Sequence, residues 1–193
     1  MKLILASGSP RRRELLAAAG FKFELHPADV DENIDETDPE RLVELLAKKK
    51  ANHIWNIRKD KELDHTAEII IGADTIVAID SMILGKPTNE GDAFLMLKRL
   101  QGRHHVVYTG VALVSSERIV SFVERTTVYM RNLTDEEIYE YIATGEPHDK
   151  AGAYGIQERG AVLIERVEGD YYSVMGLPLC RLNKELSKWK FSV

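Results

Sequence analysis

The feature that most constrains the fold is an apolar run from Ile69 to Ile79 that contains a single carboxylate, Asp74. Its β-branched residues predict a buried strand. Gly72 and Asp74 interrupt the run, so we expect the strand to be broken there. An ionised carboxylate in such surroundings is costly unless something compensates it. Asp74 is therefore either satisfied by the backbone of a capped turn or paired with a metal ion or a bound water.

Strand and helix signals alternate around this run. Lys2 to Ala6 has the pattern of a short buried strand, Ser9 of a helix N-cap, and Pro10 of the first helical residue. The mixed order of elements predicts an α/β or α+β fold around a mixed sheet with flanking helices. Further strands are expected at 21–25, 82–84, 105–114, 118–130 and 161–167, further helices at 39–54, 90–100, 134–144 and 177–189, and a charged surface loop at 58–67.

Composition excludes several classes of protein. The 193 residues contain no repeat or linker, so a single domain over 1–193 is expected. The net charge of −5 argues against a nucleic-acid partner. Cys180 is the only cysteine, so no internal disulfide can form. No apolar run has the length of a membrane span, and the short N-terminal run lacks the form of a signal peptide, so a cytoplasmic location is expected.

Ser7 to Arg13 lies where the first strand passes into a helix. Free N–H groups and the helix dipole attract anions at such a place. Arg11, Arg12 and Arg13 oppose the dipole there, which suggests that an anion compensates them, and their forked donors match phosphate oxygens. Arg12 is expected to face inward. The alternative is that these arginines are a solvated first turn. The segment lacks the Walker pattern.

Lys50 lies on the apolar face of the predicted helix at 39–54, whereas Lys48 and Lys49 project elsewhere. Its ammonium therefore either extends along the surface to solvent or reaches into a site. Three weaker candidates also fall at the ends of elements, where sites are usually built. They are Asp31-Glu32, Gly85-Lys86-Pro87 and the glycine-rich stretch from Gly152 to Gln157.

Taken in order, these segments resemble the Maf family over nearly the whole chain. The resemblance implies an α/β fold similar to that of inosine-triphosphate pyrophosphatases, with two lobes around a nucleotide cleft, a divalent metal (Mg²⁺ or Mn²⁺) and a homodimer. The matching motifs are Ser7-x-Ser9-Pro10-x-Arg12-Arg13, Asp31-Glu32, Lys50-Ala51, Gly72-Ala73-Asp74-Thr75, Gly85-Lys86-Pro87, Thr109-Gly110, Gly145 to Gln157 and Gly176-Leu177-Pro178.

The resemblance also implies roles for individual residues. The catalytic aspartate falls on Asp74 and the metal-associated acid on Glu32, so the expected metal ligands are Glu32 and Asp74. The lysines that handle phosphate fall on Lys50 and Lys86, and Lys86 is counted among the catalytic residues. Arg12 is the expected phosphate-binding arginine. Ser9 and Arg13 belong to the same expected substrate site.

The family's subgroups differ in base preference, and three positions resemble the dTTP/UTP group. They are Arg11 after the Ser-Pro pair, Thr75 after the catalytic aspartate, and Gln157 in the glycine-rich stretch. The expected reaction is attack of water on the α-phosphorus, releasing the monophosphate and pyrophosphate. Because aspartate is a weak base near neutral pH, we favour Asp74 as a metal ligand that also orients the water. The alternative function is a non-catalytic nucleotide-binding sensor in cell-division control.

Overall fold

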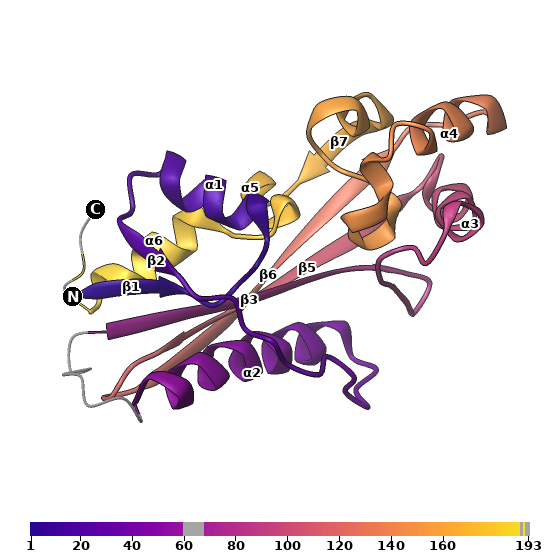
Figure 1. Ribbon diagram of the computed structural model, residues 1–193. Helices are drawn as coiled ribbons and strands as arrows, with labels where there is room; N and C mark the ends of the chain where they lie inside the picture. The colour runs from indigo at the N-terminus through magenta and orange to yellow at the C-terminus, as the bar shows by residue number, and fades with distance from the viewer. Residues whose placement is uncertain (60–67, 190, 192–193) are drawn as a thin grey trace. The chain divides into compact units, whose positions relative to one another are not determined.

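The computed structural model describes residues 1–59, 68–189 and 191. Over these residues one mixed sheet has the strand order β2-β1-β3-β5-β6-β7, with β4 added to β3, and helices flank it (Figure 1). This confirms the expected α/β class. The strands are β1 (Lys2–Leu5), β2 (Phe23–Leu25), β3 (Glu68–Ile79), β4 (Met82–Leu84), β5 (His104–Val114), β6 (Ile119–Met130) and β7 (Ile164–Glu168). The helices are α1 (Pro10–Ala18), α2 (Pro39–Lys59), α3 (Glu90–Leu100), α4 (Asp135–Ile142), α5 (Tyr171–Met175) and α6 (Leu179–Ser187).

The sheet combines parallel and antiparallel pairs. β1 lies parallel to both β2 and β3, whereas β4 and β7 run antiparallel to β3 and β6, respectively. None of the helices in the described part of the chain combines the length and the apolar character needed to cross a membrane.

Three helix starts follow from local sequence. The side chain of Ser9 accepts a hydrogen bond at the start of α1, and that of Asn89 does the same for α3. Thr134 and Glu137 form a reciprocal capping box at the start of α4. In each case a side-chain oxygen satisfies an N–H group that the first helical turn leaves free, as the sequence predicted.

The expectation of a broken strand at Gly72 and Asp74 is wrong, because β3 is continuous from Glu68 to Ile79. The parallel ladder to β1 extends to Ile71, the antiparallel ladder to β4 begins at Val77, and β5 is a further hydrogen-bonded neighbour of β3. Gly72 and Asp74 lie between these two ladders. The close approach of α2 requires a residue without a side chain at Gly72, and Lys50 of α2 compensates the charge of Asp74.

Other boundaries differ by a few residues. Residues 158–163 form a 3₁₀ helix, so β7 begins at Ile164 rather than at 161. Two further 3₁₀ turns, Glu146–Asp149 and Ala151–Ala153, and the short helix α5 were not predicted. Of the expected surface loop at 58–67, Arg58 and Lys59 belong to α2, and the remainder lies outside the described residues.

The chain divides into two compact units, and the prediction of a single domain stays a prediction. The first unit comprises 1–74, 109–124 and 176–193, and the second comprises 75–108 and 125–175. In the first unit, α2 lies on one side of the strands and α1 and α6 on the other (Figure 1). The core under α2 consists of small and aliphatic side chains, namely Ile4, Ala6, Ala47, Ala51, Ile54, Ile70, Ala112 and Val114.

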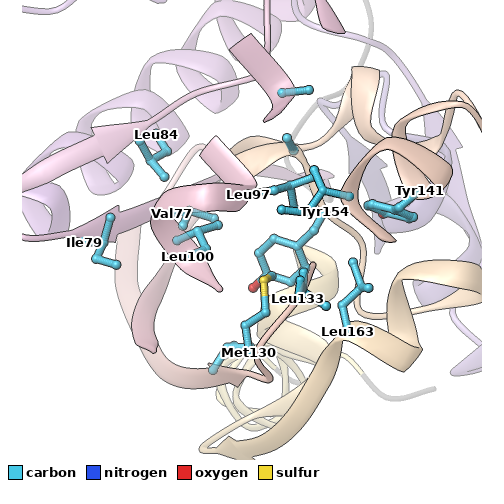
Figure 2. Close-up of a cluster of buried hydrophobic side chains, with 14 of the residues drawn as sticks. Val77, Ile79, Leu84, Leu97, Leu100, Met130, Leu133, Tyr141, Tyr154 and Leu163 are labelled. Carbon is cyan, nitrogen blue, oxygen red and sulfur yellow. The ribbon is translucent and has the colours of Figure 1, made fainter. Parts of the chain in front are cut away.

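The second unit has its own core, built from β4, the end of β3, α3 and α4 together with the 3₁₀ segments (Figure 2). Tyr154 is buried in it, and its hydroxyl lies 2.6 Å from Nε2 of His105. His105 is 1% exposed, and burial lowers the pKa of this histidine from 6.5 to about 4. The imidazole is therefore neutral at physiological pH.

Candidate active site

The start of α1 has a side-chain cap and no acidic residue in its first turn. Ser9 caps the helix by accepting a hydrogen bond from the backbone N–H of Arg12 at 3.5 Å. Ser7, just before it, accepts a hydrogen bond from the N–H of Ser9 at 3.3 Å. The first turn carries no acidic residue that would balance its arginines or repel an anion. Ser9, which is predicted to bind substrate, therefore also serves as the N-cap of α1.

The three arginines differ in environment. Arg12 is buried, as predicted, whereas Arg11 is half-buried and Arg13 is exposed. Nε of Arg12 donates to the carbonyl oxygen of Gly176 at 2.8 Å, and Nη1 donates to Oγ of Ser7 at 3.2 Å. These bonds fix the plane of the guanidinium, so Arg12 also joins the segment before α6 to the loop before α1.

Charged side chains surround the buried guanidinium of Arg12. Burial lowers the pKa of Arg12, and Asp74 and Glu32 oppose that change while Arg11 adds to it. The two carboxylates therefore act on the guanidinium through their charge. Arg12, Asp74 and Glu32, which are far apart in sequence, belong to one charged cluster in the first unit.

Lys50 is the centre of this cluster. Its Nζ lies 2.6 Å from Oδ1 of Asp74 and 2.7 Å from Oε1 of Glu32. The side chains of Lys50 and Asp74 are 10% and 11% exposed, whereas that of Glu32 is 59% exposed. The ammonium of Lys50 therefore turns inward to the two carboxylates and does not extend along the surface to solvent. The same contact removes the need for a backbone-capped turn at Asp74, because the lysine compensates the buried carboxylate.

The close packing of α2 on β3 brings Lys50 to Asp74. A Cβ atom at Gly72 would lie 2.2 Å from the carbonyl oxygen of Ala47 and 2.7 Å from the backbone nitrogen of Ala51. Only a residue without a side chain allows this approach. Residues two apart on a strand share a face, so Asp74 faces the same helix as Gly72. Lys50, in the helical turn that touches Gly72, can then meet the carboxylate.

Glu32 and Asp74 are also the two predicted metal ligands, and their chemistry suits Mg²⁺ or Mn²⁺. Both offer carboxylate oxygens, and both converge on the same ammonium group. Among the described residues, no group of three or more histidine, cysteine, aspartate or glutamate side chains could hold a metal ion. The pair nevertheless fits Mg²⁺, which commonly binds one or two carboxylates and keeps waters and substrate phosphates as its other ligands.

The remaining predicted residues belong to the second unit. Thr75 follows Asp74 directly on β3 and is half-buried, and Lys86 is exposed in the loop after β4. Gln157 is half-buried between two of the 3₁₀ segments. The carbonyl oxygen of Gly85, next to Lys86, accepts a hydrogen bond from the N–H of Gly152 at 3.0 Å. The Lys86 loop and the glycine-rich stretch are therefore joined.

A network of hydrogen bonds that the sequence did not predict holds the Gln157 loop. The carboxylate of Glu146 accepts hydrogen bonds from the Tyr141 hydroxyl at 3.1 Å and from the N–H groups of Arg159 and Gly160, both at 3.2 Å. The Tyr141 hydroxyl in turn accepts from the N–H of Gly155 at 3.0 Å. Gln157 thus lies between two anchored glycines. The only signal in the sequence was that Glu146 falls within a family motif.

The chain belongs to the family described as Maf-like protein, whose model matches residues 2–189. Among curated relatives, it is 48% identical over 193 residues to a protein of Bacillus mycoides (strain KBAB4) named dTTP/UTP pyrophosphatase. It is likewise 48% identical to a protein of the same name from Bacillus cereus (strain AH820). Both matches cover 100% of this chain and 97% of the relative.

Among solved structures, the chain is similar to the nucleoside-triphosphatase, or dITP/XTP pyrophosphatase, from Mycobacterium abscessus ATCC 19977 / DSM 44196. The TM-score is 0.39 and the sequence identity is 17%, and the match covers 75% of this chain and 93% of that one.

Proposed function

We propose that the protein is a nucleoside triphosphate pyrophosphatase that hydrolyses dTTP and UTP to the monophosphate and pyrophosphate. The observation that carries this proposal is the match over the whole chain, at 48% identity, to a relative named dTTP/UTP pyrophosphatase. The charged cluster of the first unit is consistent with it. A buried lysine and a buried arginine beside a helix start are suited to a polyphosphate.

The phosphates bind at the start of α1, where the buried Arg12 lies between Ser9 and Arg13 in the sequence. Arg12 is held in a fixed orientation by its bonds to Ser7 and Gly176. Lys50 and Lys86 supply further positive charge. Two of the five donors of a guanidinium suffice for a bidentate contact with phosphate oxygens, so the structural bonds of Arg12 do not prevent it from binding substrate.

Glu32 and Asp74 hold a divalent cation, Mg²⁺ or Mn²⁺, by their carboxylate oxygens. When bound there, the cation would supply Lewis acidity for the attacking water and for the departing pyrophosphate. Asp74 accepts a hydrogen bond from that water and orients it towards the α-phosphorus. The new P–O bond forms as the bond between the α-phosphorus and the bridging oxygen breaks, pyrophosphate leaves with that oxygen, and the proton that the water loses passes to solvent. The buried position of Asp74 on a continuous strand limits its movement, which suits an orienting role.

Recognition of the pyrimidine base rests on Arg11, Thr75 and Gln157, as in the subgroup that the sequence resembles. The anchored ends of the Gln157 loop support this role, because a side chain that reads a base must be held in place. We further propose a cytoplasmic homodimer that does not bind nucleic acid. The net charge of −5 supports the last point.

Product analysis tests the proposed reaction. The protein is incubated with Mg²⁺ and dTTP, UTP, dCTP or ITP in turn, and the products are identified by ³¹P NMR. We expect pyrophosphate and monophosphate from dTTP and UTP, and loss of activity in the presence of a chelator. Release of orthophosphate from the γ-position would contradict the proposed bond cleavage. Saturable binding of dTTP with no turnover would instead support the nucleotide sensor.

A further inference from the structure

The formal charges of four groups in the first unit cancel, and Arg11 adds a further positive charge near Arg12. Lys50 and Arg12 carry one positive charge each, and Asp74 and Glu32 carry one negative charge each. Such a cluster has no excess negative charge with which to attract a free divalent cation. A site that binds metal tightly by itself usually combines several carboxylates without an internal cation. The charge balance of this cluster therefore disfavours metal binding in the absence of substrate.

The ammonium group of Lys50 also occupies the point where the two carboxylates converge. Its Nζ is within hydrogen-bond distance of one oxygen from each, at 2.6 Å and 2.7 Å. A cation that bound the same two oxygens would require that space. The two positive charges would also repel each other strongly at such a distance in a largely buried site. Lys50 and a metal ion are therefore competitors for Asp74 and Glu32.

We propose that Lys50 is an internal counter-ion that a divalent cation must displace, so that the metal binds together with the triphosphate and not before it. The inference rests on the proposed function for the identity of the phosphate ligand. The polyphosphate brings the negative charge that the cluster lacks. The ammonium of Lys50, once displaced from the two carboxylates, would be free to pair with the phosphates. Lys50 thereby couples metal binding to substrate binding.

Two consequences follow for a protein without nucleotide. The wild type should bind free Mn²⁺ weakly, and a nucleotide should strengthen that binding. Replacing Lys50 with a neutral side chain removes the positive charge that touches both carboxylates. Such a variant should bind free Mn²⁺ more tightly, although it loses a contact to substrate. A lysine that served only to bind phosphate would have no such effect on metal affinity.

The test measures Mn²⁺ binding to nucleotide-free protein by the electron paramagnetic resonance signal of free Mn²⁺. Lys50→Met is compared with the wild type and with Lys48→Met as the matched control. Lys48 lies on the same helix and has the same charge, but its Nζ pairs with Glu44, outside the cluster. We expect Lys50→Met to bind Mn²⁺ about tenfold more tightly or better, and Lys48→Met to match the wild type. Equal or weaker binding by Lys50→Met would overturn the proposal.

A second measurement decides the question if Lys50→Met does not fold. Mn²⁺ binding to the wild type is measured with and without the α,β-imido analogue of dTTP, which cannot be cleaved at the proposed bond, and the Mn²⁺ that the analogue binds without protein is subtracted. We expect the analogue to raise the affinity by about tenfold or more, since displacement of the ammonium is then compensated. Equal affinity in both conditions would overturn the proposal. Neither measurement requires turnover, so failure of the proposed reaction in product analysis is distinguishable from failure of this inference.

Discussion

The backbone of α2 touches β3 at Gly72, where a Cβ atom would lie 2.2 Å from the carbonyl oxygen of Ala47. A real Cβ atom does not approach a backbone oxygen so closely, and neither the buried strand nor the helix can move without disturbing the core between them. The contact fixes the height of α2 above the sheet. It therefore also fixes the position of Lys50 relative to Asp74.

The first prediction is that Gly72→Ala separates α2 from β3. We expect the free energy of unfolding to fall by about 3 kcal/mol or more, since the clash is with backbone atoms and not with a flexible side chain. Urea denaturation measures the loss. The control is Gly85→Ala, because, apart from its chain neighbours, no described residue has an atom within 4 Å of a Cβ placed there. Equal stability of the two variants would show that the helix can adjust.

The second prediction concerns His105, whose pKa burial lowers to about 4. The unfolded chain takes up a proton on this residue near pH 6.5, whereas the folded chain does not until about pH 4. The contribution of the neutral His105 to the free energy of unfolding is therefore complete above pH 6.5, and it is lost as the pH falls towards 4. Linkage sets the loss at up to about 3 kcal/mol.

Urea denaturation of the wild type and His105→Gln between pH 7 and pH 4 measures this loss. Glutamine removes the titration and keeps a polar group that can bond to the Tyr154 hydroxyl. Other titrating groups contribute equally to both proteins, so the difference between them isolates His105. We expect the wild type to lose more stability than the variant over this range. A difference that did not change with pH would contradict the prediction.

The third prediction is that Tyr141→Phe loosens the Gln157 loop. The change removes the acceptor for the N–H of Gly155 and one donor to the carboxylate of Glu146. A buried amide without a partner costs about 1–3 kcal/mol. If Gln157 reads the base, KM for dTTP should rise and the preference over ITP should fall, with a smaller effect on kcat.

Tyr139→Phe is the matched control for this loop. Tyr139 lies on the same helix and is 60% exposed, and its ring stacks on that of Phe94. The change removes a hydroxyl outside the network and retains the aromatic ring. We expect unchanged KM and unchanged base preference, together with faster hydrogen exchange at Gly155 and Gly160 only in Tyr141→Phe. A parallel change in both variants would assign the effect to α4 as a whole.

Much of the fold and part of the site could be predicted because the relevant signals are local. The caps at Ser9, Asn89 and Thr134 each depend on residues within one helical turn. Helical periodicity placed Arg12 and Lys50 on inward faces, and both are buried. These predictions needed only the spacing of neighbours along the chain.

The partners of these residues could not be predicted, because they are distant in sequence. Lys50 meets Asp74 24 residues away, and Arg12 bonds to Gly176 164 residues away. The error at β3 has the same origin. Locally, Gly72 and Asp74 are poor strand residues. In the fold, the close approach of α2 requires glycine at position 72. Lys50 of α2 compensates the charge of Asp74, so tertiary contacts override the local preference.

The last prediction is that Asp74→Asn loses turnover by at least about 100-fold while the protein stays folded. Asparagine has the same shape but no negative charge, so it holds a divalent cation and orients the attacking water less well. Lys50 keeps its ion pair with Glu32, which limits the loss of stability. Pyrophosphate release from dTTP and urea denaturation measure the two properties. Asp80→Asn, which changes an exposed acid just beyond the same strand, should retain full turnover. Near-normal turnover in Asp74→Asn would exclude Asp74 from the reaction.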